Sequence, residues 1–83
     1  VPETYPGAVI LPGFVDAHVH FPQTRVIGSA SGPLLRWLER TVFPEEARFA
    51  QVRYAATVAW EFCEALVRHG TTAAAIYGSS HPE

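Results

Sequence analysis

Two short segments carry the hydrophobic patterns that are typical of β-strands. Residues 14–20 alternate with a period of two, so that one face carries a mostly polar set and the other an aliphatic set. The first set is Phe14, Asp16, His18 and His20, and the second is Val15, Ala17 and Val19. Residues 71–77 begin with two threonines and stay apolar, with a glycine on either side. The sequence therefore predicts two strands, over residues 14–20 and 71–77.

The segment between these strands has helical spacing. Four apolar residues recur at intervals of four, three and four, which places them on one stripe of a helix over residues 52–69: Ala55, Ala59, Phe62 and Leu66. The pair His69-Gly70 is a typical helix end. Ahead of it we expect a loop over residues 21–33 and a short helix over residues 34–40. We expect Pro44 to break that helix, and Glu45 and Glu46 to open a new helical turn.

A helix between two strands favours the α/β class, with the strands paired in parallel as one βαβ unit. A complete (β/α)₈ barrel needs about 250 residues, and this chain has 83. We therefore interpret it as the first, incomplete βαβ portion of a barrel, with residues 1–13 as a junction and residues 14–83 as the start of the barrel. The sequence lacks an initiator methionine and stops soon after the second strand. We expect it to be an N-terminal fragment cut from a longer chain.

Composition and charge narrow the class of partner. Hydrophobic residues make up 48% of the chain, the formal net charge is −2, and the basic residues are scattered. This predicts a globular segment that binds neither nucleic acid nor a membrane. The sequence contains no leader and no apolar run of membrane length, so we expect a cytoplasmic protein. We expect the single cysteine, Cys63, to be a small buried side chain of the long helix.

His18 and His20 are the candidate metal ligands. Residues two apart on a strand point to the same side, with Cα atoms roughly 6.5 Å apart, so both imidazoles can converge on one ion. Asp16, one step deeper on that face, could accept a hydrogen bond from a ligand histidine. Two histidines cannot complete a zinc site, so further ligands must come from elsewhere. The pattern alone also permits two surface histidines, or a small non-catalytic metal-binding or interaction module.

Residues 11–20, Leu-Pro-Gly-Phe-Val-Asp-Ala-His-Val-His, resemble the first barrel strand of the amidohydrolase superfamily. Within it, the run from His20 to Gln23 is similar to the guanine deaminases. So are residues 34–40 (Leu-Leu-Arg-Trp-Leu-Glu-Arg), with Phe-Pro-Glu-Glu at 43–46. The resemblance implies that His18 and His20 bind a catalytic metal and that Gln23 contacts a purine substrate.

The same resemblance implies one Zn²⁺ per full-length subunit, a homodimer, and hydrolytic deamination of guanine to xanthine and ammonia. The later metal ligands and the catalytic carboxylate of that family lie downstream, so no catalytic group is assigned within these 83 residues. Zinc deaminases with cysteine ligands carry a Pro-Cys-x-x-Cys segment, which this chain lacks. An amidohydrolase acting on another cyclic amide, a triazine or a different base stays open as an alternative.

Overall fold

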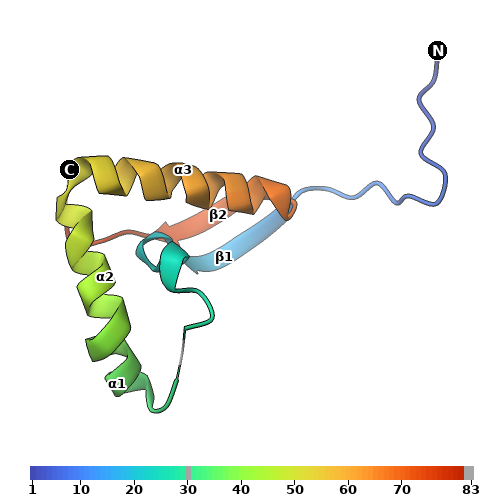
Figure 1. Ribbon diagram of the computed structural model, residues 1–83. Helices are drawn as coiled ribbons and strands as arrows, with labels where there is room; N and C mark the ends of the chain where they lie inside the picture. The colour runs from blue at the N-terminus through green and yellow to red at the C-terminus, as the bar shows by residue number, and fades with distance from the viewer. Residues whose placement is uncertain (30, 82–83) are drawn as a thin grey trace.

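The computed structural model describes residues 1–29 and 31–81. Strands β1 (Phe14–His20) and β2 (Thr71–Tyr77) pair in parallel in a two-stranded sheet. The long helix α3 (Val52–Arg68) lies along this sheet and joins β2 by a tight turn, and residues 1–13 run away from it (Figure 1). Both predicted strands, their parallel pairing and the crossover helix are therefore confirmed.

A close backbone contact fixes where the two strands start. The Phe14 amide donates a hydrogen bond to the Gly70 carbonyl at 2.8 Å. Gly70 has a φ of +86°, which glycine adopts without a steric penalty. A Cβ atom at Gly13 would lie 1.9 Å from Thr72 Oγ1 and 2.7 Å from Thr72 Cβ. The Gly13 backbone can therefore approach β2 only because the residue has no side chain.

A β-bulge interrupts the pairing in the middle of β1. Asp16 pairs with Ala74 and Val19 with Ile76, so β1 has one more residue than β2 between these two pairs. Bulges bend a strand and re-aim its side chains, and they are frequent next to active sites. The two histidines of β1 lie within and just after this irregular stretch.

The helical segments between residues 21 and 50 differ from the sequence expectation at two places. The segments are η1 (Phe21–Val26), α1 (Leu34–Trp37), η2 (Leu38–Val42), α2 (Phe43–Ala47) and η3 (Arg48–Ala50). The first half of the loop expected over residues 21–33 is the 3₁₀ helix η1. Proline is favoured in the first turn of a helix, where its missing N–H is not needed, and Pro22 occupies that place.

The helix break expected at Pro44 is wrong. The backbone continues from α1 through α2, because η2 is a π-helical stretch in which the Phe43 amide bonds to the Leu38 carbonyl, five residues back. The wider turn takes up the proline, which has no amide hydrogen to donate.

The buried core lies where η1, the helical run over residues 34–50 and α3 meet. Phe21 packs edge-on against Phe49 and Phe62, with ring centroids 5.0 and 5.8 Å apart. The apolar stripe predicted on α3 is confirmed, since Phe62 is buried and its other members are half-buried. Among the described residues, the buried apolar side chains are Pro22, Val42, Phe49, Val58 and Phe62. Because η1 begins directly after His20, this core supports the carboxyl end of β1.

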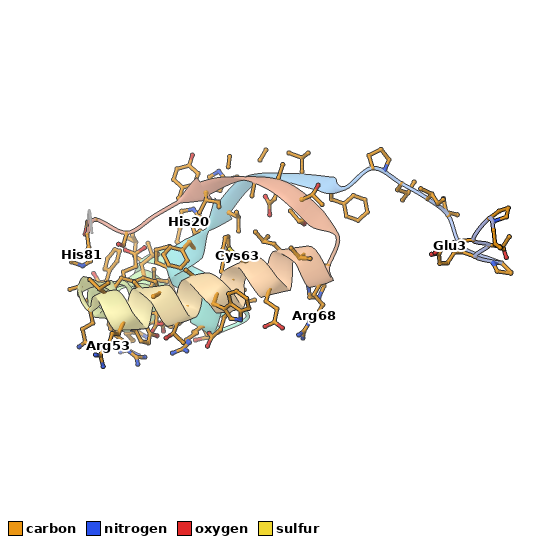
Figure 2. The ribbon with its side chains drawn as sticks, turned by 90° about the horizontal axis from the view of Figure 1, so that it is seen from above. Glu3, His20, Arg53, Cys63, Arg68 and His81 are labelled. Atoms are coloured by element: carbon orange, nitrogen blue, oxygen red, sulfur yellow. The ribbon has the colours of Figure 1, made fainter. Side chains whose placement is uncertain are left out.

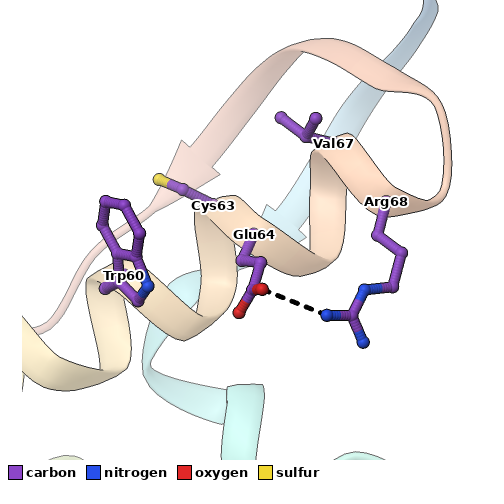
Figure 3. A pocket seen from close by; sticks show the side chains of 5 residues that line it. All are labelled: Trp60, Cys63, Glu64, Val67 and Arg68. Carbon is purple, nitrogen blue, oxygen red and sulfur yellow. Dashed lines mark hydrogen bonds and ion pairs between the residues drawn. The ribbon is translucent and has the colours of Figure 1, made fainter.

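One flank of α3 is open. Trp60 and Val67 are 74% and 72% exposed, and they line a shallow groove together with Cys63 and the ion-paired Glu64 and Arg68 (Figure 3). The expectation that Cys63 is buried is therefore wrong. Cys63 follows Phe62 by one residue, and a step of one residue turns about 100° around the helix. Within the described ranges, no helix is long and apolar enough to cross a membrane.

Candidate metal centre

His18 and His20 converge at the carboxyl end of β1. Their Nε2 atoms lie 3.0 Å apart and their ring centroids 5.0 Å apart. His18 is exposed and His20 half-buried, so the pair is open to a ligand from solvent. Figure 2 shows His20 at the end of the sheet that lies toward the helical core. The convergence predicted from the i, i+2 spacing is therefore present in the structure.

The separation of the two nitrogens can be compared with that of two zinc ligands. Nitrogen ligands lie about 2.0–2.1 Å from zinc, which puts two of them about 3.3 Å apart in a tetrahedral shell. The observed 3.0 Å is close to this value. The same distance also fits a hydrogen bond between one protonated and one unprotonated ring nitrogen. The pair can thus hold one ion with only a small adjustment, as two ligands of a larger set.

No third metal ligand joins this pair from the part of the chain that the structure describes. Among residues 1–29 and 31–81, no group of three or more histidine, cysteine, aspartate or glutamate side chains is arranged to hold a metal ion. A structural zinc site needs four protein ligands and a catalytic one three. By themselves, the two histidines could therefore supply only part of a metal site.

Asp16 supports the backbone of this strand. Its Oδ1 atom accepts a hydrogen bond from the His18 backbone amide at 3.0 Å. The bulge takes this part of β1 out of regular pairing, and the carboxylate supplies the amide with an acceptor. The sequence pattern had indicated a bond from an imidazole ring to Asp16 instead. The observed bond orients His18 through the main chain, and a direct bond to a ligand ring stays a prediction.

Tyr77 is a member of this cluster that the sequence analysis missed. Its ring centroid lies 4.5 Å from that of His18 and 4.8 Å from that of His20, and its plane is within 14° of the His20 ring. Tyr77 ends β2 and pairs in register with His20. Two parallel strands whose carboxyl ends coincide place their last residues side by side. The predicted parallel pairing of the two strands was therefore the one indication that Tyr77 would lie beside His20.

Gln23 lies in the middle of η1, three residues after His20, and is half-buried. An ion pair holds η1 against α3: Arg25 donates to both carboxylate oxygens of Glu61, at 2.8 and 2.6 Å. The hydrogen bond from Arg25 lowers the pKa of Glu61. The Arg25 guanidinium also lies over the Tyr54 ring, 4.9 Å from its centroid. The position of Gln23 thus depends on a contact between two separate elements.

A second polar cluster lies next to this ion pair and belongs to the core. Tyr54 donates a hydrogen bond to the buried carboxylate of Glu45, and Arg48 pairs with the same carboxylate at 3.3 Å. Burial, together with the bond to Glu45, raises the pKa of Tyr54. Each of these groups has a partner, so the cluster ties α2 to α3 and offers no free ligand.

Comparison with known proteins identifies several deaminases that are similar to this sequence over most of its length. A probable guanine deaminase of Deinococcus radiodurans is 55% identical over 73 residues, which are 88% of this chain and 17% of the relative. The guanine deaminase of Escherichia coli is 42% identical over 79 residues, or 95% of this chain and 18% of the relative. A 5-methylthioadenosine/S-adenosylhomocysteine deaminase of Syntrophobacter fumaroxidans is 38% identical over 69 residues, or 80% of this chain and 15% of the relative.

The chain thus spans less than a fifth of the length of these relatives. No solved structure matches it. The family model described as "Amidohydrolase family" matches residues 9–83. Because this match runs over nearly the whole chain, from the segment before β1 to the end, the chain belongs to the amidohydrolase family.

Proposed function

We propose that this chain is the first βαβ portion of a (β/α)₈ barrel in a longer, zinc-dependent guanine deaminase, which converts guanine to xanthine and ammonia. The observation that carries the proposal is the convergence of His18 and His20 at the carboxyl end of β1, which is the end where barrel enzymes place their chemistry. Its support from relatives is the identity to guanine deaminases over most of the chain. In this proposal, residues 1–13 are a junction and the barrel starts at Phe14.

In the proposed site, His18 and His20 would hold the zinc, each through a ring nitrogen that carries no proton. Zinc supplies Lewis acidity and brings the pKa of a water that it binds to about 7. The remaining ligands and the proton-transferring carboxylate come from beyond these 83 residues. Asp16 keeps the backbone of His18 in place through its bond to the amide.

Gln23 is proposed to bind the purine. Its side-chain amide has one acceptor oxygen and two donor hydrogens, so it can match neighbouring acceptor and donor groups on a purine edge. The residue follows His20 by a single turn of η1. A ligand held by the histidines and a substrate held by Gln23 would thus be positioned by one continuous stretch of backbone.

The proposal is tested on the full-length protein that contains this chain. His18→Ala and His20→Ala should each lose most of the bound zinc and nearly all xanthine formation, because each variant removes one of the three or four protein ligands that a zinc site needs. His69→Ala is a matched control, because His69 is also an exposed histidine but bonds to the Ala65 carbonyl at the end of α3. It should keep both zinc and turnover. Zinc content that is unchanged in both the His18 and His20 variants would contradict the ligand assignment.

The runner-up is an amidohydrolase with a different substrate. This alternative is supported by the similarity of the same region to a 5-methylthioadenosine/S-adenosylhomocysteine deaminase. Assaying the full-length protein with guanine, S-adenosylhomocysteine, a cyclic amide and a triazine separates the two. Guanine should be the preferred substrate by kcat/KM. Preference for any of the others would replace guanine while leaving the metal site in place.

A further inference from the structure

The ring of Tyr77 contacts both histidines of the candidate metal centre at once. The centroid distances are 4.5 Å to His18 and 4.8 Å to His20, which is the range of favourable aromatic packing. The contact follows from the sheet, because His20 and Tyr77 are register partners at the coinciding ends of β1 and β2. Tyr77 is 51% exposed, so its remaining surface is open to solvent.

Histidine rings rotate easily unless something fixes them. The χ2 torsion of histidine is broad, and two imidazoles on an exposed strand end would otherwise sample many orientations. Their Nε2 atoms must stay about 3.3 Å apart to share one zinc ion. A flat side chain that packs on both rings restricts both rotations together, and Tyr77 is placed to do this.

We propose that Tyr77 is a positioning residue that holds the imidazoles of His18 and His20 in the orientation in which their Nε2 atoms converge. This inference rests on the proposed function, because it assumes that the two histidines bind the metal. It assigns the role to the aromatic ring of Tyr77 rather than to its hydroxyl group.

The experiment compares three variants of the full-length protein: Tyr77→Leu, Tyr77→Phe and Ile76→Ala. Zinc affinity is measured by competition with a chelator, and ligand geometry by the visible spectrum of the Co²⁺-substituted protein. Loss of a group that orients metal ligands typically weakens metal binding about 10–100-fold. Tyr77→Leu should therefore bind zinc at least about tenfold more weakly and should alter the Co²⁺ spectrum. Tyr77→Phe, which keeps the ring, should match the wild type in both.

Ile76→Ala controls for general damage to β2. Ile76 precedes Tyr77, is 53% exposed, and points to the other face of the strand. It should leave zinc affinity unchanged even if it lowers the melting temperature. Wild-type affinity in Tyr77→Leu would overturn the inference, as would equal losses in the Leu and Phe variants or in Tyr77→Leu and Ile76→Ala. Failure of the proposed function has a separate signature: the wild type would bind no zinc, or His18→Ala and His20→Ala would bind it normally, and the inference would fall with it.

Discussion

Individual residues determine how closely the two strands approach at one end of the sheet and which rings pack together at the other end. At one end of the sheet, Gly13 leaves room for Thr72 of β2. At the other end, three rings from two strands pack together: His18, His20 and Tyr77. A substitution at the first end should disturb folding, whereas one at the second should disturb ligand binding.

Replacing Gly13 by alanine should destabilise the protein. The new methyl group would overlap with the Oγ1 and Cβ atoms of Thr72, and a Cβ cannot be moved away by rotating the side chain. Overpacking of this kind costs about 1–3 kcal/mol. Gly78→Ala is the control, because a Cβ there meets nothing within 4 Å. Chemical denaturation of the full-length protein measures the stability of both variants. Equal denaturation midpoints would show that the two strands can move apart enough to accommodate the methyl group without loss of stability.

Replacing Gln23 by alanine should weaken the use of guanine and leave zinc content intact. Truncation leaves a hydrogen-bonding group of the substrate without a partner, which costs about 1–3 kcal/mol, or roughly ten- to a hundredfold in kcat/KM. Steady-state kinetics and metal analysis of the same preparation check the two expectations. Wild-type kinetics on guanine would reduce Gln23 to an ordinary residue of η1.

The convergence of His18 and His20 was predictable from the sequence, and the contact that Tyr77 makes with them was not. His18 and His20 lie two apart on a strand, so local geometry alone places them on one side. Tyr77 reaches them only through the register of a pairing across more than fifty residues. No local pattern around Tyr77 specifies that register, since β2 shows no alternation of polar and apolar residues. Asp16 was correctly placed beside His18, but its backbone bond depends on a bulge that the alternating pattern conceals.

Among the elements, those with strong periodicity were predicted and those that depend on packing were not. The two strands and α3 follow from alternation and from an apolar stripe. The helix η1 is too short for a periodic signal; it is stabilised by Pro22 at its start, a bond from Thr24 to the Phe21 carbonyl at 2.6 Å, and the core beneath it. The helical path through Pro44 depends on a change of hydrogen-bond pattern, which the rule that proline ends helices does not include.

The Arg25–Glu61 ion pair should contribute a pH-dependent share of the stability. Glu61→Gln keeps the shape of the side chain and removes its charge, so the melting temperature of the full-length protein should fall. Because Arg25 lowers the pKa of Glu61, the contribution is fully present above the carboxyl's ordinary value of 4.5 and is lost as the pH falls through the lowered folded-state value. The difference between wild type and variant should therefore shrink in acid.

Glu64→Gln is the matched control for this experiment. Glu64 lies on the same helix and pairs with Arg68 at 3.0 Å, but that pair stays within α3 and joins no other element. An exposed pair within one helix contributes little, so this variant should melt close to the wild type at every pH. If the Glu61 variant also melts close to the wild type at every pH, the ion pair between η1 and α3 does not stabilise the protein.

The molecule as a whole exposes many large apolar side chains. The open flank of α3 exposes Trp60 and Val67 around Cys63, and a two-stranded sheet leaves one edge of each strand unpaired. In the proposed barrel, further strands and helices would cover these surfaces. The 83 residues alone should therefore be poorly stable.

The reactivity of the exposed Cys63 thiol can show whether further segments of the full-length protein cover this flank of α3. Cys63 in the isolated 83-residue chain should react rapidly with a thiol reagent. The same cysteine in the full-length protein should react slowly in the native state and rapidly after denaturation. A mass-spectrometric readout of labelling at Cys63 distinguishes it from cysteines elsewhere in the protein. Equal native rates in the two forms would contradict the expectation that barrel segments cover this face.

The isolated chain should also lack guanine deaminase activity. It supplies two imidazoles to the proposed zinc site, which is half of a tetrahedral shell, and no proton-transferring carboxylate has been assigned within it. Adding zinc and guanine to the purified chain should give no xanthine, and its thermal melt should be broad. Turnover together with a sharp cooperative melt would show that these residues are self-sufficient.

The parallel pairing of β1 and β2 also has a kinetic consequence. His20 and Tyr77 become neighbours only after residues 21–70 have closed a loop between them. Closing a loop of about fifty residues costs about 3.5 kcal/mol in chain entropy, from the (3/2)RT ln n term alone. On a ribosome, the two histidines emerge well before the tyrosine that packs on them. The cluster of three rings should therefore assemble late in folding, after α3 has docked on η1, so that the histidine pair is orientated only once the crossover is complete.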